Sequence, residues 1–531
     1  MRARMKFLLL SFLAGLAGAC GFAPLGLWPL TLAAFACLLW LVQRAPSLRS
    51  ALARGYWFGV GNFTLGLNWI ATAFTYQSAM PAWLGWIAVV LLSLYLAVYP
   101  AMATGLAWRW GVSLFRSPAK AGVQPSRGAP GPRPSPGYLP LVLLFAAAWI
   151  VTEWLRATMF TGFAWNPIGV SLLPTPASWL APWIGTYGLS GAAMLLAGAL
   201  LPLFHRWWKD AAILLGALGL AAALAAFTRG APLPAQAVPL RIVQPNIGQE
   251  NRWTPGFEGR TLQRLARLSR TRDARPRLLL WPESAVEPPL QDARTDPYHR
   301  RSTAQLRRVV GSLIGPNDVL LAGGITLQSK DGRNVTSGTN SVFAMARSGR
   351  IFARYDKAHL VPYGEYLPMR SLLEPIGLSR LAPGNLDFDS GPGAQTLAVP
   401  LAGKVGFQLC YEIIFSGEVV DRKNRPAFLF NPSNDAWFGS WGPPQHLAQA
   451  RLRALEEGLP VLRSTPTGIS AVVDAEGRLL HSIPWQTAGV IDAALPAPKA
   501  PTPFARAGNI LPFLFALLLA GIGIAVGRKR G

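Results

Sequence analysis

Cysteine and histidine are scarce in this chain, and so are charged residues. Three cysteines and five histidines occur in 531 residues, and the histidines form neither an HExxH motif nor a set with paired cysteines. Three cysteines are too few for a disulfide framework, and we expect neither a metal site nor a cofactor. Charged residues make up 14% of the chain and hydrophobic residues 51%, which excludes an ordinary soluble protein.

The apolar residues gather into long stretches, each close to the roughly 20 residues that a helix needs to cross a bilayer. The first contains "AGA" before Cys20, which resembles a cleavage site, but the apolar pattern resumes at once and favours an uncleaved span. We expect eight spans, at about 7–26, 27–43, 56–76, 82–107, 138–155, 178–204, 211–228 and 509–527.

Acidic residues are almost absent from the apolar part of the chain. Outside residues 241–508, 18 lysines and arginines face only two acids, and the bases gather in alternate short loops. This positive-inside pattern predicts that both termini are cytoplasmic and that the segment 231–508 lies outside the cytoplasm. The net charge of +25 could suggest nucleic-acid binding, but no basic stripe in the sequence is accompanied by an interleaved stacking motif. We therefore expect no nucleic-acid partner.

These patterns predict three parts. Residues 1–230 form a membrane domain with seven transmembrane helices and a flexible cytoplasmic loop at 112–137, which is rich in Pro, Gly, Ser and Arg. Residues 509–531 form a last transmembrane helix with a basic tail. Between them, residues 231–508 have mixed charge and short strand patterns, with helical patterns near 257–272, 298–314 and 443–458. Strands that alternate with helices predict an α/β sandwich.

One cysteine falls in this extracytoplasmic segment. Cys20 and Cys37 lie in expected spans, where a cysteine behaves as a small apolar residue, which leaves Cys410 without a disulfide partner. A lone thiol is either buried and inert or retained for its reactivity, and this observation alone leaves both interpretations open.

Two other polar residues stand, like Cys410, at the ends of apolar strand patterns. Glu283 ends "LLLWPE" and Lys357 follows "IFARYD", while Cys410 ends "GKVGFQLC". Taken singly, Glu283 could cap a helix and Lys357 could be a surface base. Together, an acid, an ammonium and a thiol at one sheet edge indicate nucleophilic catalysis, and His359 leaves a Cys-His arrangement as an alternative.

Longer motifs extend the pattern over most of the chain. They include "EWLRATMFTGFAWNPIGVS", "QPNIGQENRW", "WPES", "YDKAHLVPYGEYLP", "CYEI", "SNDAWFG", "PPQHLAQARLRALEEG" and "TGISAVVDAEG". With these motifs the segment 231–508 resembles the nitrilase superfamily, and the chain as a whole resembles the apolipoprotein N-acyltransferases. The resemblance implies an αββα sandwich with a Glu-Lys-Cys triad beside a polytopic helical membrane domain.

The resemblance also implies roles for individual residues. Cys410 would be the nucleophile, Glu283 the general base and acid, and Lys357 the oxyanion stabiliser. Further residues would support the triad or contact the substrate: Glu365, Trp253, Tyr411, Glu412 and Asn434. The family implies a phospholipid acyl donor, phosphatidylethanolamine above all. It also implies an apolipoprotein acceptor, acylated on the amine of its diacylglyceryl cysteine, and a location in the bacterial inner membrane.

Two other functions remain compatible with the sequence. A membrane-tethered amidase of the nitrilase type would use the same three residues but release an acid. A transporter or receptor with an extracytoplasmic binding module would need no reactive thiol, and Cys410 would then be structural. The scarcity of ionisable residues within the expected spans argues against an ion pathway.

Overall fold

The chain of the computed structural model divides into two compact units. The first comprises residues 1–68, 86–229 and 507–531, and the second comprises residues 69–85 and 230–506. The structure describes residues 2–76, 80–113, 138–201, 208–227, 235–249, 254–271, 275–377, 379–381 and 387–530. Trp253 and residues 114–137 of the expected cytoplasmic loop lie outside this part of the chain.

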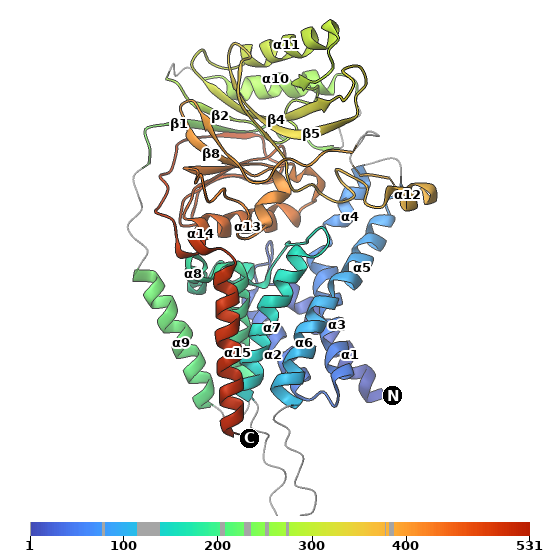
Figure 1. Cartoon of the computed structure of the whole chain (residues 1–531), viewed down its shortest axis with the longest axis vertical. Coiled ribbons are helices and arrows are strands. Elements are labelled where there is room, and N and C mark those ends of the chain that lie inside the picture. Colours follow the sequence, from blue (N-terminus) through green and yellow to red (C-terminus); the bar gives the residue numbers. More distant parts are fainter. Residues whose placement is uncertain are drawn as a thin grey trace, which may run out of the picture. The chain divides into compact units, whose positions relative to one another are not determined.

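The first unit is built from helices (Figure 1). Its α-helices are α1 (Arg2–Ala19), α2 (Trp28–Gln43), α3 (Leu48–Gly66), α5 (Leu84–Leu96), α6 (Val98–Trp108), α7 (Tyr138–Thr158), α8 (Ala181–Leu200), α9 (Trp208–Phe227) and α15 (Ile510–Arg530). Shorter helical turns are η2 (Arg109–Ser113), η3 (Ile168–Leu172) and η4 (Pro176–Leu180).

Five helical segments in the described residues are long and apolar enough to cross a membrane: Leu84–Val112, Tyr138–Thr158, Pro176–Leu200, Lys209–Phe227 and Ile510–Lys529. The shorter α2 is also apolar. A membrane domain with several apolar helices is therefore confirmed, but the count of eight spans is not. The two remaining expected spans coincide with α1 and α3, which carry basic residues within the helix.

Helix α3 differs most from its expected span at 56–76. It begins after Ser47, whose hydroxyl accepts a hydrogen bond from the backbone of Ser50, and it ends at Gly66. The helix can include Arg54 because the guanidinium is buried and donates to the carbonyl of Leu41 while lying over the ring of Phe7. In the sequence, Arg49 and Arg54 indicate a loop, and the expected span therefore begins only at residue 56. The start of α3 at Leu48 is set by tertiary contacts and not by composition.

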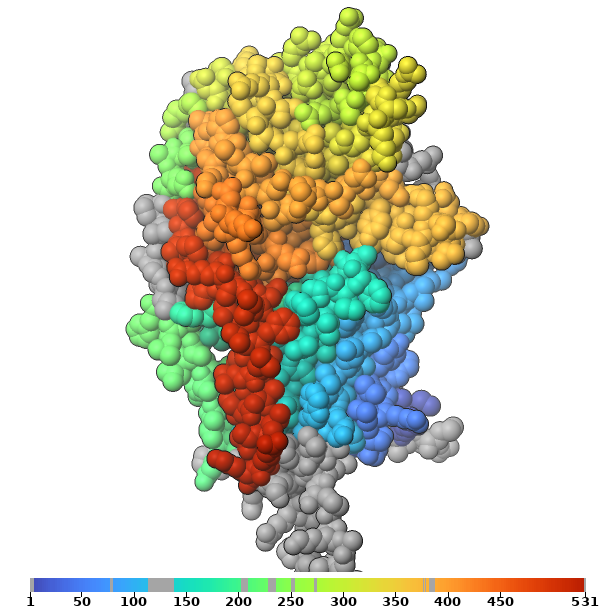
Figure 2. All heavy atoms as spheres, viewed as in Figure 1, coloured from blue at the N-terminus to red at the C-terminus, as the bar shows by residue number. Residues whose placement is uncertain are grey.

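Helix α15 runs along the surface of the first unit (Figure 2). From residue 510 to residue 525 its exposed side chains are apolar, among them Ile510, Leu514, Leu517, Leu518 and Ile522, and the exposed basic residues Arg528 and Lys529 follow at its end. An uninterrupted apolar surface of this length is what a lipid-facing helix presents, because the bilayer core offers no partner to a polar side chain.

The described strands of the second unit form two sheets. One has the order β13-β1-β2-β4-β5-β6, with β3 also paired to β4, and the other has the order β12-β11-β10-β9-β8-β7. The first sheet contains β1 (Pro239–Gln244), β2 (Leu278–Leu280), β3 (Gln291–Asp292), β4 (Val319–Gln328), β5 (Ser337–Ala346), β6 (Ile351–Asp356) and β13 (Gly489–Ala494). The second contains β7 (Thr396–Val399), β8 (Gly403–Phe407), β9 (Phe428–Pro432), β10 (Val461–Ser464), β11 (Ser470–Val473) and β12 (Leu479–Ile483).

Alternating side chains place the two sheets face to face. On β2, Leu278 and Leu280 belong to the core between the sheets, which also contains Phe407 and Phe430 of the second sheet. Leu279 points to the opposite face and packs with the helices there. Helices α10 (Phe257–Ser269) and α11 (Pro297–Ser312) cover that face, while α13 (Gly442–Glu457) lies on the far side of the second sheet (Figure 1). The layer order is the predicted αββα sandwich.

Residues 69–85 belong to the second unit although helices of the first unit flank them. They include α4 (Ile70–Ala73) and η1 (Phe74–Tyr76), which lie beside η9 (Asp435–Trp437). The ring centroids of Trp69 and Phe438 are 4.6 Å apart, and those of Tyr76 and Trp437 are 6.1 Å apart. This segment therefore covers the chain that directly follows Asn434.

Candidate functional site

Glu283 stands at the end of β2, where the chain leaves the sheet. Its backbone passes very close to β4: a Cβ atom on Gly323 would lie 2.6 Å from the Cα atom of Glu283, so only glycine fits there. The carboxylate is 7% exposed, and its Oε1 atom accepts a hydrogen bond of 2.8 Å from the side-chain amide of Asn340 on β5. The strand end and the amide together fix this acid.

Lys357 follows β6 directly and brings a buried ammonium to the same place. Its Nζ atom lies 2.9 Å from Oε2 of Glu365 and 3.6 Å from Oε1 of Glu283. The amide of Asn340 also donates to Glu365, at 2.8 Å, so that Asn340 and Lys357 both bridge the two carboxylates. Lys357 is 1% exposed, which means that its charge is balanced by these acids and not by solvent.

Cys410 begins a single helical turn, η8 (Cys410–Ile414), three residues after β8 ends at Phe407. Its backbone adopts a left-handed conformation with φ of 49°, which is uncommon for a residue with a side chain. The charges of Glu283 and Lys357 and the backbone N–H of Asn434 all act on its buried thiol. The structure thus brings Glu283, Lys357, Glu365 and Cys410 together at one edge of the sandwich.

Burial and charge define the protonation states of this group. Burial raises the pKa of the Glu283 carboxyl, and Lys357 only partly offsets it. Burial and the charge of Glu283 raise the pKa of the Cys410 thiol well above its usual range. Burial alone would lower the pKa of Lys357, but the carboxylates of Glu365 and Glu283 raise it. The resting thiol is therefore protonated beside a permanent cation and a carboxylate with increased proton affinity, which suits a general base.

Glu412 connects the lysine and cysteine segments. Its Oε1 atom accepts hydrogen bonds from Tyr355 Oη (2.8 Å) and from the backbone N–H groups of Ala358 (2.8 Å) and His359 (3.1 Å). Its Oε2 atom accepts one from the N–H of Leu409 (2.7 Å). A carboxylate with four such donors fixes the spacing between residues 355–359 and 409–412.

The remaining expected residues lie around this group. Tyr411 is buried, with its ring centroid 5.2 Å from that of Phe415. Asn434 is 7% exposed, and its buried Oδ1 atom has no hydrogen-bond partner among the described residues. The ring of His359 stacks on Phe415 with centroids 3.8 Å apart, which turns it toward an aromatic neighbour. Trp253 lies outside the described part of the chain.

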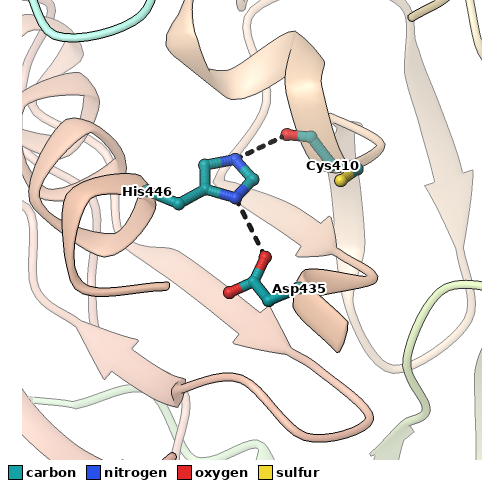
Figure 3. A group of neighbouring side chains, drawn as sticks. All are labelled: Cys410, Asp435 and His446. Carbon is teal, nitrogen blue, oxygen red and sulfur yellow. Dashed lines mark hydrogen bonds and ion pairs between the residues drawn. The ribbon is translucent and has the colours of Figure 1, made fainter. Parts of the chain in front are cut away.

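A second polar cluster holds the backbone of Cys410 (Figure 3). His446 on α13 lies with Nε2 3.0 Å from the carbonyl oxygen of Cys410 and Nδ1 3.0 Å from Oδ1 of Asp435. Arg463 on β10 pairs with both oxygens of Asp435, at 2.7 and 2.6 Å. Burial would raise the pKa of Asp435, but Arg463 and His446 lower it, so this buried carboxylate remains charged.

Sites of this composition can hold metal ions, since Cys410, Asp435 and His446 each offer a ligand atom within 4.8 Å of the others. Nε2 of His446, however, faces the carbonyl oxygen of Cys410, and Nδ1 lies 3.0 Å from Oδ1 of Asp435 and 3.0 Å from Nη2 of Arg463, which can donate to it. The three residues therefore serve one another as partners, and the cluster does not present the free imidazole lone pair that a metal requires.

The sequence interpretation missed Asn340, Asp435, His446 and Arg463. Asn340 lies in a strand just before the apolar run "VFAMA", and Arg463 lies in the apolar run "PVLRS". A polar residue within a buried strand needs a partner, which is the signal that could have drawn attention to both. His446 lies on a helix and is 36 residues from Cys410, so no local pattern links the two.

Comparison with known proteins finds a family match for each of the two parts of the chain. Residues 14–199 match the Apolipoprotein N-acyltransferase N-terminal domain family, and residues 240–500 match the Carbon-nitrogen hydrolase family. Among solved structures, Nit3 of Saccharomyces cerevisiae, a member of branch 10 of the nitrilase superfamily, is 17% identical. It covers 49% of this chain and 90% of its own, with a TM-score of 0.35.

Two curated relatives share nearly the whole chain. The apolipoprotein N-acyltransferase of Rhodopseudomonas palustris is 34% identical, over 95% of this chain and 92% of its own length. That of Caulobacter vibrioides is 35% identical, over 97% of this chain and 93% of its own. With both of its parts and nearly its full length matched, the chain belongs to the apolipoprotein N-acyltransferase family of membrane acyltransferases.

Proposed function

We propose that the chain transfers a fatty acyl group from a phospholipid to the N-terminal amine of the diacylglyceryl cysteine of apolipoproteins, through a thioester on Cys410. The proposal is carried by one observation: the buried Cys410 thiol lies within the electrostatic reach of Glu283, whose carboxylate lies 3.6 Å from the ammonium of Lys357. The membership of the chain in its family supports the acceptor, because the curated relatives are named for acylating apolipoproteins.

In the first half-reaction, Glu283 takes the thiol proton while the sulfur of Cys410 attacks an ester carbonyl of the phospholipid. The negative charge that develops on the carbonyl oxygen is stabilised by Lys357 and the backbone N–H of Tyr411. The tetrahedral species collapses, the carbon–oxygen bond of the ester breaks, and Glu283 gives its proton to the departing lysophospholipid. An acyl thioester remains on Cys410.

In the second half-reaction, the acceptor amine attacks the thioester carbonyl and forms a carbon–nitrogen bond. Glu283 accepts a proton from the amine, the carbon–sulfur bond breaks, and the thiolate of Cys410 recovers that proton. The product is an amide. Glu365 keeps Lys357 charged through both steps, since its Oε2 atom lies 2.9 Å from Nζ.

A lipid donor accounts for the membrane helices. Moving an acyl chain of ~15 methylenes from bilayer to water costs on the order of 10 kcal/mol, so the reaction must take place at the membrane. We assign phosphatidylethanolamine as the preferred donor and the bacterial inner membrane as the location. The catalytic unit faces the periplasm and both termini are cytoplasmic, as the alternating basic loops support.

The test is the intact mass of the purified chain in detergent after exposure to phosphatidylethanolamine without acceptor. We expect a hydroxylamine-labile increment of one acyl group in the wild type and none in Cys410→Ala. Cys37→Ala, at a cysteine of the membrane helices, is the matched control and should still be acylated. If the wild type showed no increment and released no lysophospholipid, acyl transfer through Cys410 would be refuted. Released fatty acid with a soluble amide substrate would favour the amidase instead.

A further inference from the structure

The peptide group that joins Cys410 to Tyr411 is held from its carbonyl side by two buried donors. Nε2 of His446 lies 3.0 Å from the carbonyl oxygen of Cys410, and Nδ2 of Asn431 lies 3.4 Å from it. A trans peptide is planar, and its C=O and N–H bonds point in opposite directions. Whatever fixes the carbonyl of Cys410 therefore also fixes the direction of the N–H of Tyr411.

We propose that His446 is a positioning residue for acyl transfer, which aims the N–H of Tyr411 at the oxyanion by holding the carbonyl of Cys410. The role rests on the proposed function, in which that N–H stabilises the tetrahedral species. His446 does not touch the substrate or the sulfur in this role. It acts through a single peptide group.

The backbone at Cys410 needs such support. A φ of 49° places the residue in the left-handed region, which costs free energy for a residue with a Cβ atom. Local preference would not keep the peptide in this orientation by itself. The orientation is instead determined by the partners of the Cys410 carbonyl.

Those partners are themselves fixed by one guanidinium. Arg463 pairs with Asp435, which faces Nδ1 of His446, and Arg463 also donates to Oδ1 of Asn431 and, at 2.8 Å, to Oγ of Ser433. Arg463, Asp435, His446 and Asn431 are all fully buried. Both donors to the Cys410 carbonyl thus belong to one rigid network, which is anchored on β10 and α13.

The proton that matters can be assigned from the geometry. In a neutral ring, Nδ1 of His446 can accept from Nη2 of Arg463 at 3.0 Å, which leaves the hydrogen on Nε2, where it faces the carbonyl oxygen of Cys410; a charged ring carries a hydrogen on both nitrogens. A hydrogen bond to the carbonyl also polarises the peptide group and strengthens its N–H as a donor. The same contact can therefore aim the N–H of Tyr411 and increase its strength.

The test compares two amide substitutions of His446 that place the same group at different depths. In His446→Gln the amide nitrogen reaches the position of Nε2 and can still donate to Cys410. In His446→Asn it reaches only the position of Nδ1, beside Asp435. His481→Asn is the control, since His481 is an exposed histidine on β12. All variants are full-length protein in detergent.

Two rates are measured for each variant. The first is single-turnover acylation by phosphatidylethanolamine, which passes through an oxyanion. The second is alkylation of Cys410 by iodoacetamide, which needs the thiolate but forms no oxyanion. We expect His446→Asn to slow acylation by about 10- to 100-fold, somewhat less than the loss of a whole oxyanion donor. Alkylation should stay within about threefold of wild type, and His446→Gln should recover most of the acylation rate.

Other outcomes would overturn the role of His446. Acylation at the wild-type rate in His446→Asn would show that the carbonyl needs no such partner. A parallel loss of alkylation and acylation would show that His446 only maintains the fold, and an equal loss in the Gln variant would show that the donor to Cys410 is not what matters. A wild-type chain that alkylates but never acylates would instead refute the proposed function.

Discussion

The side-chain amide nitrogen of Asn340 lies 2.8 Å from Oε1 of Glu283. The same nitrogen lies 2.8 Å from Oε1 of Glu365, so one neutral amide holds two carboxylates beside a single ammonium. Two acids this close would repel each other without such a donor and Lys357 between them. The candidate base therefore depends on a residue that transfers no proton itself.

Replacing this amide tests that dependence. We expect Asn340→Leu, which has a similar volume and no donor, to slow acylation about 10- to 100-fold because Glu283 loses its orientation. The measurement is single-turnover thioester formation by intact mass. Asn334→Leu, at an exposed turn, is the control. An unchanged rate in Asn340→Leu would mean that Lys357 alone positions the two acids.

Removing the charge of Glu365 should move the pH dependence of the reaction. Glu365 raises the pKa of Lys357 and contributes to the raised pKa of Glu283. In Glu365→Gln both pKa values fall, so both limbs of the profile of kcat/KM against pH should move to lower pH. Activity lost near pH 9 should exceed activity lost near pH 6. Glu374→Gln, whose side chain is 64% exposed, should keep the wild-type profile. A uniform loss at all pH values would contradict this role.

Substitutions at Glu412 and at its partner Tyr355 can distinguish a structural role of Glu412 from substrate contact. In Glu412→Gln one carboxylate oxygen is replaced by an amide N–H₂ group, which cannot accept the hydrogen bonds donated by residues 355–359 or by residue 409. We therefore expect the unfolding free energy to fall by roughly 3 kcal/mol. Tyr355→Phe removes only one of the four hydrogen bonds and should cost about 1 kcal/mol. Thermal unfolding in detergent should rank the two variants in that order. Wild-type stability with lost activity in Glu412→Gln would assign Glu412 to the substrate instead.

Glu457, at the end of α13, should make stability depend on pH. Burial and the neighbouring Glu456 raise its pKa from 4.5 to about 7, against the opposing charge of Arg425. Because the folded state holds this proton more tightly than the unfolded state, stability falls as pH rises from 4.5 to 7. The shift corresponds to roughly 3 kcal/mol.

The variant Glu457→Gln should lack this part of the pH dependence. It should unfold at a higher temperature than wild type at pH 8 and at about the same temperature at pH 4. Glu258→Gln, on the exposed face of α10, should follow the wild type at both pH values. A wild type that is stabilised relative to Glu457→Gln at pH 8 would show that Arg425 outweighs burial.

Much of the sandwich was predictable because each strand carries its own pattern. Short apolar runs predict strands, and one such run precedes each of Glu283, Lys357 and Cys410. Their positions just after β2, β6 and β8 could therefore be expected. The two-residue β3 has no run long enough to signal a strand. The edge strand β13 alternates too weakly, and its pairing with β1 joins residues about 250 positions apart.

The contacts that orient the site were harder to predict from the sequence. Asn340 matters because β5 lies beside β4 and β6, and His446 matters because α13 returns to the carbonyl of Cys410. Such relationships depend on the packing of distant elements, and a single sequence does not encode them locally. Arg54 shows the same limit in the first unit, where burial and a carbonyl partner extend α3 beyond its apolar pattern.

The unit that contains Cys410 is assembled from two separate pieces of chain, residues 69–85 and 230–506. A fragment of residues 230–506 alone would leave the rings of Trp437 and Phe438 without Tyr76 and Trp69. The hydrolase-like half is therefore not a portable module. A chimera that exchanges it between relatives must exchange the short piece between α3 and α5 as well, and gene fusions that move only the longer piece would separate aromatic partners that fold together.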